Sequence, residues 1–501
     1  MYSNLRKMEK LRPIMLGGTG SDVGKSILAT GLCRIFLQDG FQPAPFKAQN
    51  MALNSAATPD GKEIGRAQAV QAEACELCPT TDMNPILLKP SSDKTSQVVL
   101  NGIVTGNKNA FEFYRKEGRE ILKEAVRTSF DRLNERYNPI VMEGAGSIAE
   151  INLKETDLVN MSMARYADAA VILVADIDRG GVFASVYGSI MLQEEQDRKL
   201  IKGVIVNKFR GDMKLFDEGK KMMERLCKIP VIGVVPFFDD IRIDEEDSVA
   251  LKEKKTEPAE DKINIAVVKV NHISNYTDFL PLELIPEINL YYTADIEKIG
   301  KADIIILPGS KSTIADLKSL EENGIVSAIK EASAKGVKIW GVCGGYQMLG
   351  LSIEDPDQQE GEIRSIEGMG LLPVRTVLEG KKITVKTKFK VNSSYCEGYE
   401  IHMGRSEIIN SSQSFCTKSN GETDGCMVKN GAVAGTYIHG LFENRAVINF
   451  LLEGVTDKQI EVKDFKGEKE SQYNLLAERL RKYIDMETLY KIMKRDDRGT
   501  R

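Results

Sequence analysis

The chain has 501 residues, with 68 Lys or Arg against 73 Asp or Glu, so its formal net charge is −5. This balance disfavours a nucleic-acid-binding protein, and 42% hydrophobic with 28% charged residues excludes wholesale disorder. We find no secretory signal and no apolar run of about 20 residues, so we expect a cytoplasmic protein without membrane association. The eight cysteines are scattered along the chain, so we expect reduced thiols. The length predicts about two to four domains.

Short apolar runs alternate with helical stretches, such as 109–136, through the first half of the chain. The runs are continuous rather than interleaved with polar residues, as is typical of parallel strands buried on both faces. They lie at 14–16, 140–142, 169–175, 203–206 and 231–235. The pattern predicts an α/β domain with a doubly wound sheet over residues 1–244.

The first of these strands runs into a glycine-rich loop. Residues 17–26 read Gly-Gly-Thr-Gly-Ser-Asp-Val-Gly-Lys-Ser and precede an apolar helix, which is the order of a phosphate-binding loop (P-loop). In such a loop the backbone N–H groups surround phosphate oxygens, the lysine reaches the terminal phosphates and the serine hydroxyl ligates Mg²⁺. A glycine-rich turn with an incidental lysine is the alternative. The predicted nucleotide-binding residues are Gly18, Thr19, Ser21, Asp22, Gly24, Lys25 and Ser26.

Two later strands end in polar side chains that fit the same site. Glu143 follows the strand at 140–142, and a carboxylate at the carboxyl end of a buried strand is where a second Mg²⁺ contact is expected beside Ser26. Asn207 ends the strand at 203–206, where its amide could contact a purine edge. The alternatives are a loop or helix-capping carboxylate for Glu143 and a turn-capping amide for Asn207.

A charged, proline-containing stretch at 245–262 separates this pattern from a second one. We interpret it as an interdomain linker, with a loop inside a single domain as the alternative. Strands expected at 263–270, 303–307 and 337–342 indicate a second α/β domain over 263–450. Residues 451–501 are charged and helix-prone, and we expect this tail to form a surface helix packed on the second domain.

Cys343 follows the last of these strands and precedes a helical stretch. A sharp strand-to-helix turn presents a nucleophile, and the helix amino terminus favours a thiolate. The N–H groups of Gly344 and of Gly309, at the end of another strand, are candidate donors to an oxyanion. The chemistry of the residues does not rank the histidines that could serve as its base. These are His272, His402 and His439.

Longer strings make a more specific match, since the chain resembles the cobyric acid synthase family over roughly residues 12–445. The strings include residues 46–55, 63–73, 83–90, 149–153, 176–183, 276–279, 308–313, 398–405 and 436–440. Enzymes of this family use glutamine and ATP to amidate the b, d, e and g carboxylates of adenosylcobyrinic acid a,c-diamide, giving adenosylcobyric acid. The resemblance therefore implies a corrinoid substrate, ATP, Mg²⁺ and L-glutamine as nitrogen donor.

The resemblance also implies a fold and roles for individual residues. The first half is similar to the dethiobiotin synthetase branch of P-loop proteins, and the second half to class I glutamine amidotransferases. Cys343 would be the nucleophile and His439 its base, while Lys25, Ser26 and Glu143 would serve ATP and Mg²⁺. Lys47 would face a phosphate or a carboxylate.

One departure concerns the group that orients the base. Triad amidotransferases usually place an acid two residues after the histidine, and here that position is Leu441. Glu443 or a backbone carbonyl would have to orient His439, or the site would work as a dyad.

Two other functions remain as alternatives. A cobyrinic acid a,c-diamide synthase shares both modules but differs in the strings around Asn50 and Asp178. A P-loop ATPase or regulatory protein with a vestigial amidotransferase domain is disfavoured by the intact Cys343 and His439. The order of amidations and the oligomeric state do not follow from the sequence.

Overall fold

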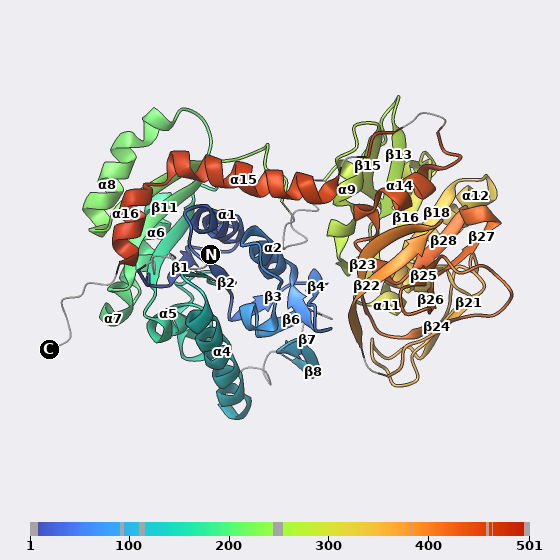
Figure 1. Ribbon diagram of the computed structural model, residues 1–501, viewed down its shortest axis with the longest axis horizontal. Helices are drawn as coiled ribbons and strands as arrows, with labels where there is room; N and C mark the ends of the chain where they lie inside the picture. Colours follow the sequence, from blue (N-terminus) through green and yellow to red (C-terminus); the bar gives the residue numbers. More distant parts are fainter. Residues whose placement is uncertain are drawn as a thin grey trace, which may run out of the picture.

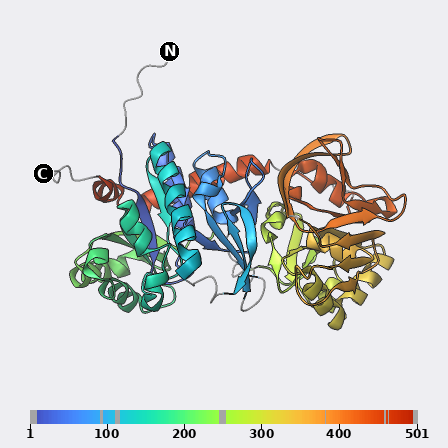
Figure 2. The ribbon, with the colours of Figure 1, turned by 90° about the horizontal axis from the view of Figure 1, so that it is seen from below.

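The computed structural model describes residues 9–90, 95–109, 116–243, 254–380, 382–456, 460–462 and 464–494. The protein has two lobes that lie side by side along its longest axis (Figures 1 and 2). The start of the predicted linker falls outside the described residues, and 254–262 form no helix or strand. Among the described residues, no helix is long and apolar enough to cross a bilayer.

The first lobe is built on a six-stranded parallel sheet, which confirms the predicted doubly wound α/β fold. The strand order is β12-β11-β10-β1-β9-β2. The strands are β1 (Ile14–Gly18), β2 (Ala44–Phe46), β9 (Ile140–Glu143), β10 (Ala170–Asp176), β11 (Ile201–Phe209) and β12 (Val231–Pro236). All seven residues of β10 are buried, because helices cover both faces of the sheet.

Two hydrophobic clusters occupy the two faces of this sheet. One contains apolar side chains of the helices α4, α5, α6 and α8, and the other contains those of α1. The helices of this lobe are α1 (Lys25–Gln38), α2 (Arg66–Ala74), α4 (Lys116–Arg136), α5 (Met161–Ala167), α6 (Val182–Met191), α7 (Glu195–Arg198) and α8 (Asp217–Cys227).

Residues between β2 and α4 form two small sheets on the side of the first lobe that faces the second (Figure 1). One has the order β3-β6-β7-β8, from β3 (Gln49–Met51), β6 (Ile86–Pro90), β7 (Thr95–Leu100) and β8 (Ile103–Asn109). The other pairs β4 (Ser55–Ala57) with β5 (Glu63–Gly65). This β4–β5 hairpin touches the second lobe, where the Ser55 N–H donates to Asn275 Oδ1 at 3.0 Å.

The second lobe holds another six-stranded sheet, of order β15-β13-β16-β18-β28-β27. All neighbours are parallel except β27 and β28. The strands are β13 (Ile263–Val268), β15 (Ile288–Thr293), β16 (Ile304–Leu307), β18 (Lys338–Val342), β27 (Cys426–Val428) and β28 (Val433–Thr436). The helices are α9 (Leu280–Glu283), α10 (Ile296–Ile299), α11 (Thr313–Glu322), α12 (Ile325–Ala334), α13 (Gly344–Leu349) and α14 (Arg445–Leu452).

Three smaller sheets complete this lobe: a five-stranded and a two-stranded antiparallel sheet, and a four-stranded mixed sheet in which β19 and β21 are parallel. The five-stranded sheet contains β22 (Ile383–Val391), β23 (Ser394–His402), β25 (Cys416–Lys418), β26 (Thr423–Asp424) and β29 (Ile438–His439). The four-stranded sheet contains β19 (Ser352–Glu354), β20 (Ser365–Glu367), β21 (Val374–Val377) and β24 (Arg405–Ile408). The two-stranded sheet pairs β14 (Ile273–Ser274) with β17 (Gly309–Ser310).

The carboxyl-terminal tail forms α15 (Phe465–Tyr483) and α16 (Met486–Met493), and its predicted packing on the second domain is wrong for most of its length. Figure 1 shows α15 running along α1 of the first lobe toward the second. Its buried Leu480 approaches α1 so closely that a Cβ on Gly31 would lie 2.2 Å from Leu480 Cδ1. The apolar side chains of α15 join the hydrophobic cluster that contains α1, on one face of the first sheet.

Only the beginning of α15 reaches the second lobe, where Lys469 Nζ lies 3.8 Å from Glu443 Oε1.

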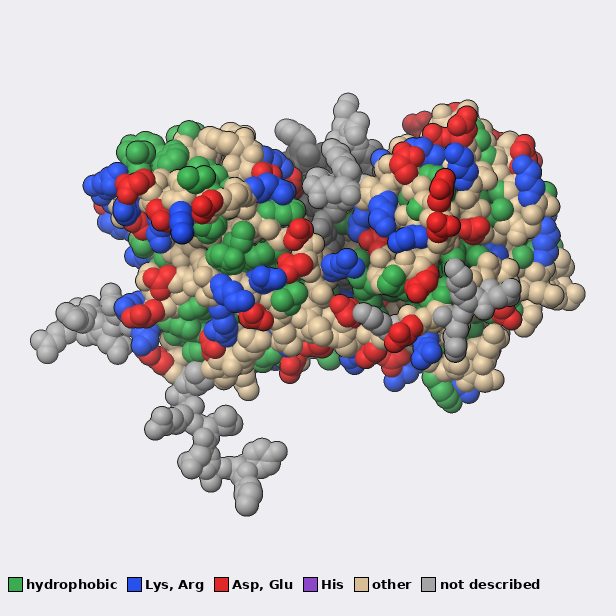
Figure 3. Space-filling view, turned by 90° about the horizontal axis from the view of Figure 1, so that it is seen from above, with side chains coloured by type: hydrophobic (Ala, Val, Ile, Leu, Met, Phe, Trp, Pro, Cys, Tyr) green, Lys and Arg blue, Asp and Glu red, His purple; other side chains and the backbone are tan. Residues whose placement is uncertain are grey.

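Seen from above, both lobes carry positively charged Lys and Arg and negatively charged Asp and Glu side chains interspersed over the surface (Figure 3).

Candidate functional site

Cys343 lies on a strained turn between β18 and α13. Its φ of +52° is in the left-handed region, which a side chain with a Cβ rarely adopts. The turn is tightly packed, since a Cβ on Gly345 would lie 2.1 Å from the Leu307 carbonyl oxygen. The thiol is 7% exposed, and its sulfur lies 3.7 Å from the Ile401 carbonyl oxygen. This is the nucleophile turn that the sequence predicts, at the carboxyl edge of the second sheet.

His439, on β29, meets both Cys343 and an aspartate. Its Nδ1 lies 2.6 Å from Asp278 Oδ2, and Asp278 Oδ1 accepts the Gly440 N–H at 2.9 Å. Burial alone would lower the pKa of His439, but the charge and hydrogen bond of Asp278, together with a hydrogen bond to Cys343, raise that pKa to about 10. His439 is therefore an imidazolium at neutral pH, held between a carboxylate and the thiol.

Asp278 is the functional residue that the sequence reasoning missed. It lies on a 3₁₀ helix, η5 (Tyr276–Phe279), within one of the strings that carry the family resemblance. Asp278, and not the suggested Glu443, contacts His439 Nδ1, and Glu443 Oε1 lies 3.8 Å from Lys469 Nζ. The only sign of this residue in the sequence was an acidic residue inside a stretch that matches the family. The sequence near position 278 does not indicate that it contacts position 439.

The two predicted oxyanion glycines lie close to Cys343 and His439. A Cβ on Gly344 would lie 2.8 Å from the Ser310 backbone nitrogen, and a Cβ on Gly309 would lie 3.3 Å from His439 Cε1. The segment Gly309–Ser310 therefore packs directly against the Cys343 turn and the His439 ring. The role of these N–H groups as donors to an oxyanion stays a prediction.

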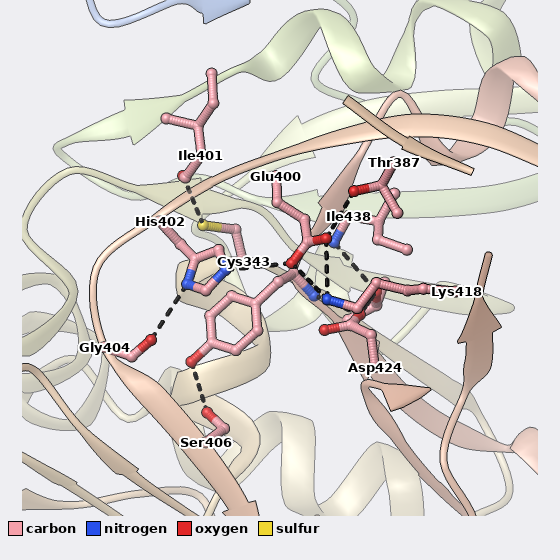
Figure 4. Close-up of polar contacts among 12 residues, drawn as sticks. Cys343, Thr387, Glu400, Ile401, His402, Gly404, Ser406, Lys418, Asp424 and Ile438 are labelled. Carbon is pink, nitrogen blue, oxygen red and sulfur yellow. Dashed lines mark hydrogen bonds and ion pairs between the residues drawn. The ribbon is translucent and has the colours of Figure 1, made fainter. Parts of the chain in front are cut away.

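The other two histidines have structural partners. His402 stacks on Tyr437 with ring centroids 3.7 Å apart, and its two ring nitrogens contact Glu400 at 3.4 Å and the Gly404 carbonyl at 3.2 Å (Figure 4). His272 Nδ1 lies 2.9 Å from Asp316 Oδ1. Of the three histidines, His439 is the one whose ring contacts Cys343.

Glu400 belongs to a buried network next to the nucleophile (Figure 4). Burial opposes its ionisation, but hydrogen bonds from His402 and Thr387 and the charge of Lys418 lower the pKa of Glu400 to about 2. Lys418 Nζ lies 3.1 Å from both carboxylate oxygens. The network fixes β23, whose Ile401 carbonyl faces the Cys343 sulfur.

The predicted nucleotide-binding loop lies at the carboxyl end of β1 in the first lobe. Lys25 Nζ lies 3.0 Å from the Gly20 carbonyl oxygen and 3.1 Å from that of Gly146, so the lysine folds over the loop. A Cβ on Gly18 would lie 2.7 Å from the carbonyl oxygens of both Gly20 and Gly146, and Gly24 has a φ of +91°. The loop therefore requires glycine at both positions.

The remaining loop residues lie around the same turn. The Thr19 N–H donates to the Val174 carbonyl at 3.0 Å, which fixes the loop to β10. Ser21 Oγ lies 3.9 Å from the Cβ position of Gly146. Asp22 has a φ of +57° and pairs with Arg179 at 3.3 Å.

Glu143 and Ser26, the two predicted metal ligands, are in direct contact. Ser26 Oγ donates to Glu143 Oε1 at 2.8 Å, Lys47 Nζ lies 2.9 Å from the same oxygen, and Gln71 Nε2 donates to Oε2 at 2.7 Å. Burial would raise the pKa of Glu143, but the charge of Lys47 and these hydrogen bonds hold it below its usual range. An ionised carboxylate beside a serine hydroxyl supplies the oxygen ligands that Mg²⁺ prefers.

Asn207 supports the loop from the neighbouring strand. Its Nδ2 donates to the Val23 carbonyl at 2.9 Å, and a Cβ on Gly24 would lie 2.2 Å from the same nitrogen. One of the two N–H donors of this amide is therefore committed to the loop, and the second N–H and the side-chain oxygen remain for other contacts.

Comparison with known proteins assigns each half of the chain to a family. The CobQ/CobB/MinD/ParA nucleotide binding domain matches residues 14–250, and the CobB/CobQ-like glutamine amidotransferase domain matches residues 264–447. Curated relatives match along nearly the whole length. A cobyric acid synthase of Phocaeicola vulgatus is 58% identical over 98% of this chain and 100% of its own. Those of Bacteroides fragilis and Streptococcus sanguinis are 56% and 46% identical, over 98% and 97% of this chain and 100% of their own.

Proposed function

Because the chain belongs to the cobyric acid synthase family, we propose that it amidates the b, d, e and g carboxylates of adenosylcobyrinic acid a,c-diamide, using ammonia from glutamine and energy from ATP. The observation that carries the proposal is the presence in one chain of two separate centres. One is Cys343 with His439 and Asp278, and the other is the P-loop with Glu143. We expect the enzyme to act in the cytoplasm, where ATP and glutamine are available.

The centre at Cys343 would release the nitrogen. The Cys343 thiolate attacks the side-chain amide carbon of glutamine, and the Gly344 and Gly309 N–H groups stabilise the oxyanion. The His439 imidazolium donates a proton to the departing nitrogen, which leaves as ammonia. A thioester remains, and His439 then takes a proton from water as the water attacks the thioester and releases glutamate. Asp278 keeps the imidazole oriented through Nδ1 in both steps.

The centre in the first lobe would activate the acid. A corrin carboxylate is anionic and lacks a leaving group, so ammonia does not displace its oxygen directly. We propose that the γ-phosphoryl group of ATP is transferred to it, giving ADP and an acyl phosphate from which ammonia displaces phosphate. Lys25 and Lys47 would neutralise charge on the phosphates, and Ser26 with Glu143 would hold Mg²⁺.

Mass spectrometry of the product tests this function. After incubation with the a,c-diamide, ATP, Mg²⁺ and glutamine, we expect four successive conversions of carboxylate to amide. Cobyrinic acid offered in place of the diamide should react poorly at its a and c positions. Amidation at a and c instead would identify the chain as an a,c-diamide synthase. Glutamine hydrolysis without any amidated corrinoid would favour a protein with another acceptor.

A further inference from the structure

Two oppositely charged side chains flank the Cys343 turn without pairing with each other. Lys311 directly follows Ser310, whose backbone nitrogen lies 2.8 Å from the Cβ position of Gly344. Glu360 reaches the same turn through Thr313. Thr313 Oγ1 donates to Glu360 Oε1 at 3.3 Å and lies 3.2 Å from the Cβ position of Gly344. Both charged side chains are half-buried, so a small molecule at the thiol can reach them.

Glu360 is held rigidly in this position. Its Oε2 accepts the Ile314 N–H at 3.2 Å, in the first turn of α11, and its own N–H donates to Asp355 Oδ2 at 2.8 Å. Asp355 is fully buried and anchors the loop. The carboxylate is therefore fixed at one place beside the nucleophile rather than free on a surface loop.

The ammonium of Lys311 has no ion pair or hydrogen bond among the described residues. The charges of Glu360, Glu63 and Cys343 are nevertheless close enough to act on it, and so is the like charge of Lys89. Burial lowers the pKa of Lys311 and raises the pKa of Glu360 to about 7, because neither charge fully compensates the other. An enclosed cation and anion that lie near each other but do not pair are suited to a ligand that carries both charges.

We propose that Lys311 and Glu360 recognise the amino-acid end of glutamine, with Lys311 binding the α-carboxylate and Glu360 the α-ammonium group. The inference rests on the proposed glutaminase role of Cys343 and extends it to substrate selection. The amide carbon of glutamine at the thiol is three bonds from its α-carbon, so the two charged substituents lie a short distance from the nucleophile. Charge-assisted hydrogen bonds at both substituents distinguish glutamine from other primary amides.

Two amides that each lack one charged group provide the test. Glutaramate keeps the carboxylate of glutamine but lacks the α-ammonium group, whereas 4-aminobutanamide keeps the ammonium group but lacks the carboxylate. We expect Lys311→Met to reduce kcat/KM about 10- to 100-fold for glutamine and for glutaramate, and to leave 4-aminobutanamide unchanged. We expect Glu360→Gln to reduce it for glutamine and 4-aminobutanamide, and to leave glutaramate unchanged. Lys318→Met, on the exposed face of α11, is the matched control and should change none of the three.

Several outcomes would overturn the inference. A variant that reduces hydrolysis of all three amides equally has a structural defect, and ammonium-driven synthesis by the same variant checks that the first lobe is intact. A Lys311→Met enzyme with an unchanged KM for glutamine but more glutamate formed per amide would place Lys311 on the route of ammonia instead. A different result would contradict the proposed function alone. In that case the wild-type enzyme would hydrolyse glutamine, and the two variants would show the predicted effects on the three amides, but the corrinoid would not be amidated.

Discussion

Asp278 and His439 are 161 positions apart in the chain, yet Asp278 Oδ2 lies 2.6 Å from His439 Nδ1. A carboxylate at this place holds the imidazole ring in one orientation and keeps it protonated against the effect of burial. The acid that triad amidotransferases usually carry two residues after the histidine is supplied here by a 3₁₀ helix at the start of the second lobe.

Asp278→Asn should impair glutamine hydrolysis and change its pH dependence. In the wild type the pKa of His439 is about 10, so the imidazolium persists through neutral and mildly alkaline pH. Without the charge of Asp278 that pKa should fall, so the imidazolium should lose its proton at a lower pH than in the wild type. We expect kcat/KM for glutaminase at pH 8 to fall about 100-fold or more, with the alkaline limb displaced to lower pH.

Ammonium-driven amidation is the control for this variant, because it does not use His439, and it should remain at the wild-type level. An Asp278→Asn enzyme with an unchanged pH profile would show that the Asp278–His439 contact does not set the protonation of the base.

Glu143→Gln should disable the first lobe selectively. The substitution removes the negative charge that contacts Ser26, Lys47 and Gln71. It leaves the buried Lys47 ammonium without a carboxylate partner. We expect ADP formation to fall about 100-fold with either nitrogen donor, and the Mg²⁺ concentration for half-maximal rate to rise. Glutamine hydrolysis should persist. Glu150→Gln, at an exposed position in the following loop, is the matched control, and an equal loss there would argue against a specific role for Glu143.

Lys382→Met should loosen the contact between the lobes. Lys382 Nζ lies 2.5 Å from Glu63 Oε2, and Lys89 Nζ lies 2.7 Å from Glu63 Oε1. The two lysines hold the pKa of Glu63 well below its usual range despite burial, so the carboxylate stabilises the protein above pH about 4.3 and this contribution is lost as the pH falls below that value. Burial lowers the pKa of Lys382 to about 7, so the pair between Lys382 and Glu63 also weakens as the pH rises above that value. Losing one partner should cost about 1.5 to 3 kcal/mol.

The functional measurement for this variant is the number of glutamate molecules formed per amide formed. A loosened interface lets ammonia escape, so the ratio should rise above that of the wild type. Lys386→Met, exposed on β22, which begins one residue after Lys382, should leave it unchanged. A wild-type ratio in Lys382→Met would mean that this ion pair does not contribute to nitrogen transfer between the lobes.

Leu480→Ala should destabilise the first lobe. The side chain is fully buried between α15 and α1, and its truncation leaves a cavity beside Gly31. We expect a loss of about 2 to 5 kcal/mol, seen as a lower midpoint in thermal unfolding followed by circular dichroism. Leu226→Ala, at a position that is 49% exposed on α8, should change the midpoint little. Equal effects of the two substitutions would contradict the docking of the tail on the first lobe.

The features that could be predicted from the sequence are those that local pattern determines. Continuous apolar runs identified most of the parallel strands but not β2, β15 or β28, and the glycine spacing around Lys25 and Cys343 identified both loops. Antiparallel strands such as β22 and β23 have one polar face and no such continuous run, so they gave no comparable signal.

The contacts that the sequence could not predict join distant segments. Asp278 reaches His439, and Gln71 reaches Glu143, through the tertiary fold alone. The amphipathic pattern of α15 indicated a buried face, but it did not indicate which lobe offered the complementary surface.

The most direct test of two cooperating centres is amidation of the corrinoid diamide by Cys343→Ser with each nitrogen donor in turn. We predict that synthesis with glutamine is lost and that synthesis with added ammonium continues at the wild-type rate, whereas Lys25→Ala loses both. Loss of ammonium-driven amidation in Cys343→Ser, or its survival in Lys25→Ala, would contradict the division of labour between the two lobes.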